Sequence, residues 1–319
     1  MMFKLAPCFK DYLWGGTKLK EDFNFNSDFK KVAEAWMLSC HKDGENIVVG
    51  GKYDGKTLSE VINSEEKSIL GKNAEKFDAF PILIKLIDAK DDLSVQVHPN
   101  DEYALKNEGE YGKTECWYIV DCEENAEIIY GFNEEITKDE FKQRIDDGTF
   151  LDVVNRVKVQ KGELYFIEAG TLHAIGKGIL LAEIQQNSNT TYRVFDYNRI
   201  DANGNTRELH TKKAIDVTNC VIPEAIESAK DRMNDKDGYF ETLLAQCDLF
   251  TVYSLNIYKK CNKMVGDKSF VSILVLNGEG TIFCGCDKML VKKGDSVFIS
   301  ADSGEFEIDG CLEVLETSL

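Results

Sequence analysis

The segment that most constrains the fold is GELYFIEAGTLHAIGKGI, residues 162–179, where an apolar run leads into a glycine turn and then a histidine. A strand followed by a tight turn sets the next side chain at a fixed offset, which is how a β-barrel directs an imidazole toward a metal ion. Upstream, residues 93–101 (LSVQVHPND) carry Gln96 and His98 at alternate positions of a β-rich run. Alternate strand residues point to one face, so the two segments can converge on one ion.

Short apolar runs bounded by Gly, Asn or Asp dominate the chain and predict β-strands at sandwich or barrel spacing. They cover residues 80–89, 93–97, 115–122, 126–132, 162–169, 179–186 and 190–197. Helical patterns are limited to residues 137–148, 150–157, 210–218 and a short segment starting near Leu58. The sequence therefore predicts a mainly β protein with a few short helices.

A polar and charged segment, residues 223–238, separates these runs from a second series of strand patterns toward the C-terminus. This change of composition is typical of a linker between domains. We therefore expect a metal-binding catalytic domain at 1–225, with a helical insertion near 137–157, and a smaller β-domain at 239–319.

The two halves share a sequence pattern, which indicates a duplication. VQKGELYFIEAGTLHAI resembles VKKGDSVFISADSGEFEI, with Gly162 aligned to Gly294. Eleven residues after each glycine stand His173 in the first half and Glu305 in the second. The C-terminal domain is therefore expected to be degenerate and to lack the metal position.

Charge restricts the partners of this chain. The formal net charge of −18 at pH 7 argues against nucleic acid and against anionic membrane surfaces, since both require a basic footprint. No apolar run approaches the roughly 20 residues of a membrane span. An anionic small-molecule substrate would need a local cationic pocket.

The start of the sequence and the cysteines both point to the cytoplasm. MMFKLAPCFKDYLWGG has a short apolar core and no convincing cleavage site for a signal peptide. The ten cysteines are too sparse in a 319-residue chain for a disulfide scaffold, so reduced thiols are expected.

Of the four histidines, His98 and His173 fall in the two motifs described first. Glu115, at the start of the run ECWYIVDC, would complete a set of two histidines and one carboxylate, with Gln96 as a fourth oxygen ligand. Three protein ligands and an open position are typical of a catalytic zinc site. Each residue also has an ordinary interpretation, because strand histidines often only form hydrogen bonds and glutamates at strand ends are usually solvated.

These segments resemble the cupin superfamily and, within it, the type I mannose-6-phosphate isomerases in their shorter bacterial form. Gly162, Gly170 and His173 match the second cupin motif, although Glu168 stands where a proline is usual. Sixteen residues separate His98 from Glu115, which is the longer insertion that these isomerases carry. QVHPND, KTECW and EIQQNSNTTYR are the most specific segments of a resemblance that runs from YLWGGTKL to TTYRVFDYNR.

The resemblance implies two cupin-type (jelly-roll) β-barrel domains and one Zn²⁺ per chain. Its implied metal ligands are Gln96, His98, Glu115 and His173. Its implied catalytic residues are Arg193 and Lys113, and the residues expected to contact the substrate are Ser94, Lys85, Arg199 and Glu183. Relatives often have an aspartate where this chain has Asn189, so no acid or base role is carried over to that side chain.

The implied activity is an aldose–ketose isomerase that interconverts mannose-6-phosphate and fructose-6-phosphate through an enediol. Proton transfer between neighbouring carbons is general acid–base chemistry on an intermediate with negative charge on oxygen, which a metal ion and an arginine can stabilise. Two other interpretations stay open: another metallo-cupin enzyme, such as an oxygenase or a cupin-type glucose-6-phosphate isomerase, and a non-catalytic sugar-binding or regulatory cupin. The sequence also leaves open the catalytic base, the metal in vivo and the oligomeric state.

Overall fold

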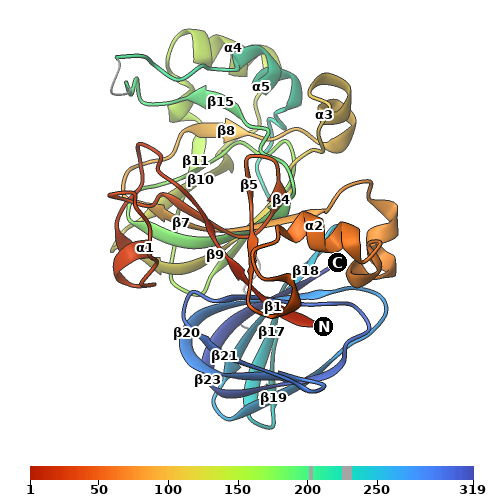
Figure 1. Cartoon of the computed structure of the whole chain (residues 1–319). Helices are drawn as coiled ribbons and strands as arrows, with labels where there is room; N and C mark the ends of the chain where they lie inside the picture. The colour runs from red at the N-terminus through yellow and green to blue at the C-terminus, as the bar shows by residue number, and fades with distance from the viewer. Residues whose placement is uncertain (201–203, 225–231) are drawn as a thin grey trace.

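The structure, a computed structural model, describes residues 1–200, 204–224 and 232–319. Within these residues, antiparallel sheets are stacked in layers, with the C-terminal strands in the lower layer and helices α3, α4 and α5 at the opposite end (Figure 1). The mainly β class with few short helices is therefore confirmed. Part of the predicted linker, residues 225–231, lies outside the described residues.

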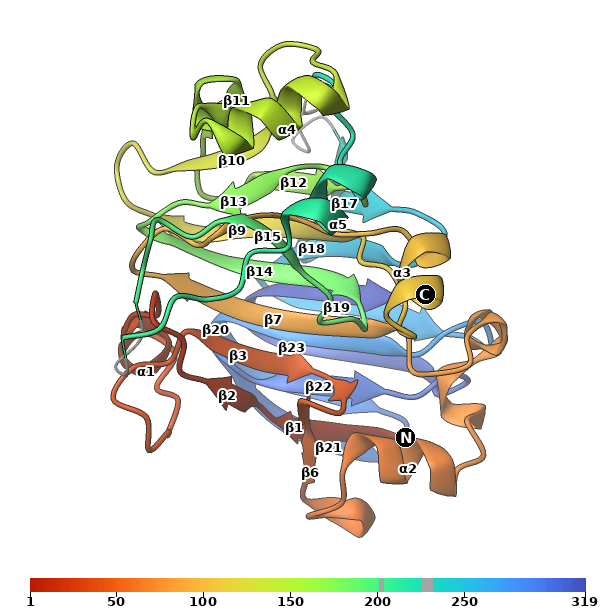
Figure 2. The same ribbon diagram turned by 90° about the horizontal axis from the view of Figure 1, so that it is seen from above.

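Two sheets form the central and upper layers, and Figure 2 looks down on them from above. The six-stranded sheet has the order β12 (Leu164–Ile167), β9 (Glu115–Cys122), β14 (Ile179–Gln186), β7 (Ile82–Ala89), β3 (Glu34–Leu38) and β2 (Cys8–Lys10). The five-stranded sheet has the order β11 (Val154–Lys158), β10 (Glu127–Phe132), β13 (His173–Ile175), β8 (Val95–Val97) and β15 (Tyr192–Phe195). A short hairpin, β4 (Cys40–His41) and β5 (Gly44–Glu45), lies beside them.

The lower layer is a ten-stranded sheet that also recruits strands from the N-terminus. Its order is β16 (Met233–Lys236), β17 (Tyr239–Gln246), β18 (Thr251–Ile257), β23 (Gly304–Ser318), β20 (Val271–Cys284), β22 (Ser296–Ile299), β1 (Met2–Ala6) and β6 (Ile47–Val49), with β19 (Lys260–Val265) on β23 and β21 (Asp287–Lys292) on β20. Met2 of β1 is paired with Ile299 of β22. The first strand of the chain thus completes a sheet made mostly of C-terminal residues, while the division at 1–225 and 239–319 stays a prediction.

The helices are short and lie outside the sheets. They are α1 (Lys18–Glu21), α2 (Leu58–Ser64), α3 (Asp101–Asn107), α4 (Lys138–Asp146) and α5 (Thr211–Val217), with single 3₁₀ turns η1 (Gly51–Tyr53), η2 (Ser68–Leu70), η3 (Lys72–Lys76) and η4 (Phe150–Asp152). The helices expected near Leu58, at 137–148 and at 210–218 are confirmed by α2, α4 and α5. In α2, Thr57 and Glu60 form a reciprocal capping box that begins the helix.

The helix expected at 150–157 is wrong beyond its first turn, because strand β11 begins at Val154. Val154 is buried and Arg156 is exposed on this strand, and Val157 pairs with Ile128 of β10. A run of β-branched residues that can join an existing sheet edge gains ladder hydrogen bonds, which outweighs a weak helical pattern.

Separate apolar layers hold the sheets together. Trp117 and Ile119 of the six-stranded sheet pack with Ile128 and Ile175 of the five-stranded sheet. On the opposite face of the six-stranded sheet, Ile84 and its neighbours pack against the ten-stranded sheet. The functional residues described below therefore have rigid β layers on both sides.

Other expectations concern the membrane and the thiols. Among the described residues, no helix has the length and apolar character needed to cross a bilayer. All ten cysteines are free thiols.

The contact between the central and lower layers yields a stability prediction. Phe298 is fully buried there, with its ring stacked on Phe3 at 5.1 Å and on Phe270 at 4.9 Å between centroids. We expect Phe298→Ala to lower the free energy of unfolding by about 3–5 kcal/mol, since it removes apolar contacts and leaves a cavity. Urea denaturation measures this effect. The matched control is Leu290→Ala, whose side chain is 72% exposed and whose loss should change stability by about 0.5 kcal/mol or less.

Candidate metal centre and active site

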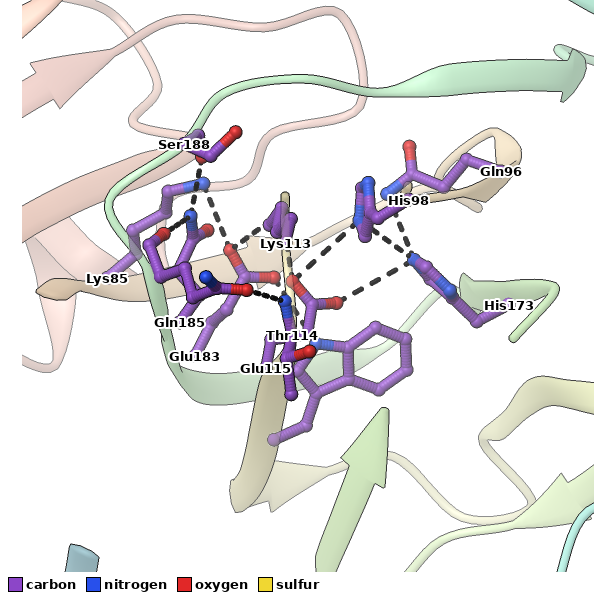
Figure 3. A network of polar contacts seen from close by, with 12 residues as sticks. Lys85, Gln96, His98, Lys113, Thr114, Glu115, His173, Glu183, Gln185 and Ser188 are labelled. Atoms are coloured by element: carbon purple, nitrogen blue, oxygen red, sulfur yellow. Dashed lines mark hydrogen bonds and ion pairs between the residues drawn. The ribbon is translucent and has the colours of Figure 1, made fainter. Parts of the chain in front are cut away.

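Most of the polar residues selected from the sequence meet between the five-stranded and six-stranded sheets, and Figure 3 shows Lys85, Gln96, His98, Lys113, Glu115, His173 and Glu183 there. In the five-stranded sheet, Gln96 of β8 is directly opposite His173 of β13. In the six-stranded sheet, Lys85 of β7 is directly opposite Glu183 of β14. Side chains directly opposite each other on a shared face lie within about 5.5 Å at Cβ, so strand pairing alone forms both contacts.

Three buried residues form a compact set of potential metal ligands. His98, Glu115 and His173 each offer a ligand atom, and these atoms all lie within 4.8 Å of one another. The two Nε2 atoms are 3.1 Å apart, and the oxygens of Glu115 lie 3.8 Å from His98 Nε2 and 3.6 Å from His173 Nε2. The sequence prediction that these residues converge is therefore confirmed as geometry.

The backbone determines the tautomer of both histidines. His98 Nδ1 lies 2.9 Å from the carbonyl oxygen of Thr190, and His173 Nδ1 lies 2.8 Å from that of Thr171. A carbonyl can only accept, so each Nδ1 carries the proton and each Nε2 presents a lone pair. Burial lowers the pKa of His98 well below its usual range and that of His173 to about 4, so both rings are neutral near pH 7.

This arrangement fits a metal ion. Two Nε2 lone pairs face each other at 3.1 Å, which is repulsive unless a cation lies between them. Among the described residues, Oε1 of Glu115 has no hydrogen-bond partner although it is buried. Backbone carbonyls that hold the second nitrogen of ligating histidines are the usual support around bound metals, and two imidazoles with a carboxylate suit zinc and several other divalent ions.

Gln96 and Ser94 lie at the edge of this set. The amide nitrogen of Gln96 is 3.4 Å from Nε2 of His173, and its amide oxygen accepts a hydrogen bond of 3.4 Å from the Ser94 hydroxyl. Rotation of the amide by 180° would present the oxygen to the ligand set instead. Gln96 is therefore within reach of an ion held by the three buried residues.

A row of buried charges leads away from the ligands. Lys113 Nζ lies 2.9 Å from Glu115 Oε2 and 3.6 Å from Glu183 Oε1. Lys85 Nζ lies 2.9 Å from the same oxygen of Glu183 and 3.9 Å from Glu34 Oε2. Acidic and basic groups therefore alternate from Glu34 to Glu115, which offsets the cost of burying each charge.

The charges in this row shift the pKa values of its two central carboxylates, Glu115 and Glu183, in opposite directions. Burial raises the pKa of Glu115, and the nearby charge of Glu183 raises it further. Burial also opposes ionisation of Glu183, but Lys113 and Lys85 outweigh it, and the pKa of Glu183 is lowered. Burial likewise disfavours the ammonium of Lys85, yet Glu183 and Glu34 raise its pKa overall. Two carboxylates with pKa values pushed apart are a common arrangement at catalytic sites.

The remaining candidates lie on β15 and the segments that follow it. Arg193 is paired with Gln96 across the strands, and its Nη1 donates to the carbonyl oxygen of Glu208 at 2.8 Å. Arg199 is ion-paired with Asp196 instead of lying free. Asn189 is exposed and donates to Asp43 at 2.9 Å, so it takes part in a surface contact with an acid from another loop.

Three charged residues of this region were not among the candidates selected from the sequence. Glu34 stands in AEAWMLSCH, and its carboxylate accepts a hydrogen bond from Trp36 Nε1 at 2.7 Å. Asp196 and Arg207 contact each other through Arg207 Nε at 2.7 Å. Glu34 carries a signal, because it is an acid in an otherwise apolar strand, whereas Arg207 lies in an ordinary polar segment.

Comparison with known families gives two matches that lie in different parts of the chain. Residues 2–142 match the model of the phosphomannose isomerase type I catalytic domain. Residues 240–318 match the model of the mannose-6-phosphate isomerase cupin domain.

Comparison with individual proteins agrees with these two family matches. The chain is 42% identical to mannose-6-phosphate isomerase ManA of Bacillus subtilis over 98% of this chain and 97% of that protein. It is 38% identical to mannose-6-phosphate isomerase of Streptococcus mutans over 95% of this chain and 93% of that protein. A crystal structure of the Bacillus subtilis isomerase superposes with a TM-score of 0.92 at 38% identity, covering 100% of this chain and 99% of that one.

A more distant structure shares the fold. A mannose 6-phosphate isomerase bound with zinc and yttrium superposes with a TM-score of 0.79 at 17% identity, over 99% of this chain and 98% of that one. The match to the cupin domain model and the Bacillus subtilis structure confirm the cupin-type fold expected from the sequence, but among the described residues the sheets are open and do not close into the expected barrels.

The ligand set makes a direct prediction about metal binding. We expect His173→Ala to lose the bound divalent metal, because it removes one of the two lone pairs that face each other. Metal analysis after equilibration with Zn²⁺ and gel filtration measures the retained ion. His41→Ala is the matched control, since His41 is also buried but stands apart from the ligand set, and it should retain the metal. Retention of metal at the wild-type level by His173→Ala would rule out this site.

Proposed function

The chain belongs to the type I phosphomannose isomerase family, and from that premise we propose that it interconverts mannose-6-phosphate and fructose-6-phosphate at the site between the two sheets. The observation that carries this proposal is the pair of neutral, buried imidazoles whose lone pairs face each other beside Glu115. A non-catalytic sugar-binding protein would have no need for such a pair next to a buried row of ionised groups.

We propose that one Zn²⁺ per chain is held by His98, Glu115 and His173, with Gln96 as the fourth protein ligand. The donor chemistry supports this choice, because neutral imidazole and carboxylate are common zinc ligands. When bound, the ion supplies positive charge that polarises and orients neighbouring oxygens of the open-chain sugar.

Lys113 is the residue best suited to move a proton at this site. Its Nζ is held between Glu115 and Glu183, at 2.9 Å and 3.6 Å, so a proton leaving the ammonium has a carboxylate within reach. Glu183 also accepts from Trp117 Nε1 at 3.2 Å, which fixes its orientation. We propose that Lys113 and Glu183 act together in the transfer of a proton between the two carbons.

The other selected side chains divide between substrate contact and support. Lys85 is enclosed by Glu183 and Glu34, so we assign it to holding Glu183 in place, close to the substrate. Ser94 lies beside Gln96 and is proposed to contact the sugar. Arg193 and Arg199 are proposed to bind the anionic parts of the substrate, because a chain of net charge −18 needs local guanidinium groups to attract a phosphate.

Two broader proposals follow from the same premise. We propose that residues 1–225 are the catalytic domain and residues 239–319 a smaller domain that acts by packing, without a catalytic metal. We also propose that the enzyme works in the cytoplasm on a small-molecule sugar phosphate.

A coupled assay tests the function. Mannose-6-phosphate should be converted to fructose-6-phosphate, treatment with a chelator should abolish turnover, and one equivalent of Zn²⁺ should restore it. Chelator-resistant turnover would reject the metal-dependent mechanism. Absence of turnover in the zinc-loaded protein would reject the function itself.

Arg193 yields a prediction about the transition state. If its charge stabilises the developing enediolate, Arg193→Ala should lower kcat by about 10²-fold or more without loss of metal. Arg193→Lys should fail nearly as badly, since lysine lacks the planar fork that can hold two oxygens. Steady-state kinetics together with zinc content checks both variants. Near-normal turnover in either variant would show that Arg193 does not stabilise the transition state and is an ordinary surface charge.

A further inference from the structure

Three arginines gather around one buried carboxylate next to the proposed catalytic site. Asp196 is 5% exposed, and its Oδ2 accepts a hydrogen bond from Arg207 Nε at 2.7 Å. Its Oδ1 accepts from Arg199 Nε at 3.1 Å. Arg193 lies close enough for the charge of Arg207 to disfavour its guanidinium.

The charges in this cluster do not cancel. Arg199 and Arg207 both bind the carboxylate of Asp196, and Arg193 lies close to them, so among the described residues the guanidinium groups of this cluster outnumber the buried carboxylates. Glu208 is exposed, so water screens it, and Asp92, whose backbone carbonyl accepts from Arg199, is partly exposed. Burial and Arg207 lower the pKa of Arg193, whereas hydrogen bonds from Arg207 and Arg199 overcome burial and lower the pKa of Asp196. The cluster therefore keeps a local positive charge that favours a bound anion.

The position of the cluster relates it to the metal ligands. Arg193 is opposite Gln96, and Gln96 is opposite His173, so the three residues stand in a row across adjacent strands. Two strand spacings separate Arg193 from His173, roughly 10 Å along the hydrogen-bonding direction. Nε of Arg193 is buried and has no hydrogen-bond partner among the described residues. One donor of the cluster therefore remains available on the face that carries the metal ligands.

The turn that holds the cluster is conformationally costly. Tyr197 and Asn198 both have positive φ, at 54° and 52°, in the turn between Asp196 and Arg199. A left-handed conformation is unfavourable for a residue with a Cβ, and tyrosine has no side-chain oxygen near the backbone to offset this cost. The ring of Tyr197 packs on Arg199, whose guanidinium carbon lies 5.4 Å from the ring centroid. Backbone strain that fixes charged groups in place is a feature of binding sites.

We propose that Arg207 is a further substrate-binding residue, which binds the phosphate group together with Arg199, and that Asp196 positions both guanidinium groups for this role. The inference rests on the proposed function, since it names the residues that recognise the anionic end of the same substrate. A phosphate dianion suits this local positive charge. Arg207 holds Asp196 through Nε and Nη2 and, among the described residues, makes no hydrogen bond through Nη1, which can donate to a phosphate oxygen. The guanidiniums also supply the local positive field that the acidic chain otherwise lacks.

The test is Arg207→Gln, compared with wild type in steady-state kinetics, in competitive inhibition by inorganic phosphate, and in inhibition by mannose. Loss of a charged hydrogen-bond donor should raise KM for mannose-6-phosphate and Ki for phosphate by about 10-fold or more, with kcat changed much less. Inhibition by mannose, which carries no phosphate, should be unaffected. Zinc content should equal that of wild type.

Two further variants separate binding from a structural role. Arg144→Gln removes the same type of charge from helix α4, where Arg144 pairs with Glu140, and should leave both constants unchanged. Arg207→Lys retains a charge without the planar fork and should give a Ki for phosphate between those of wild type and Arg207→Gln. If Arg207→Gln does not fold, an unchanged Ki in folded Arg207→Lys overturns the proposal. Equal changes in the inhibition by phosphate and by mannose also overturn it.

Failure of this inference can be distinguished from failure of the proposed function. Binding of inorganic phosphate to the zinc-loaded protein, measured by calorimetry, requires no turnover. If wild type is an active isomerase and Arg207→Gln binds phosphate normally, only the inference fails. If wild type lacks isomerase activity but Arg207→Gln loses phosphate affinity, the inference stands and the function fails.

Discussion

Two imidazole nitrogens that face each other without a proton between them are the interaction on which this site depends. The backbone carbonyls of Thr171 and Thr190 fix the tautomers, and burial keeps both rings neutral. In a low-dielectric interior such a pair of lone pairs is unfavourable by itself. The arrangement becomes favourable when a cation is shared, so the apoprotein is built in advance for an ion. This preorganisation requires rigid strands, which the two facing sheets provide.

The row of charges from Glu34 to Glu115 is the second consequence of burial. Isolated buried ions cost several kcal/mol each, and alternation of sign is the arrangement that reduces this cost without solvent. Strand pairing sets the alternation, because Lys85 and Glu183 are directly opposite each other on β7 and β14. The same groups that make the charges tolerable are the ones to which we assign proton transfer. Stability and chemistry therefore rest on one set of contacts.

Sequence reasoning located the ligands because their signals are local. Gln96 and His98 stand at alternate positions of one β-rich run, and a glycine turn precedes His173, so a common face could be expected from the residues, whereas the full set of potential ligands came from the family resemblance. It could not find Arg207, because the contact with Asp196 depends on how a long loop returns to its own strand. Nor could it foresee strand β11 in place of a helix, since the gain comes from pairing with β10. A contact between residues far apart in the sequence leaves no local pattern from which it could be predicted.

The pairing of β1 with β22 also affects how the chain is made. Met2 and Ile299 are neighbours in one sheet, so nearly the whole sequence lies between the first strand and its partner. During synthesis the first strand leaves the ribosome earliest and must wait with an unpaired edge until the last residues are available. Closing so long a loop is slow, and unpaired strand edges favour aggregation in the meantime.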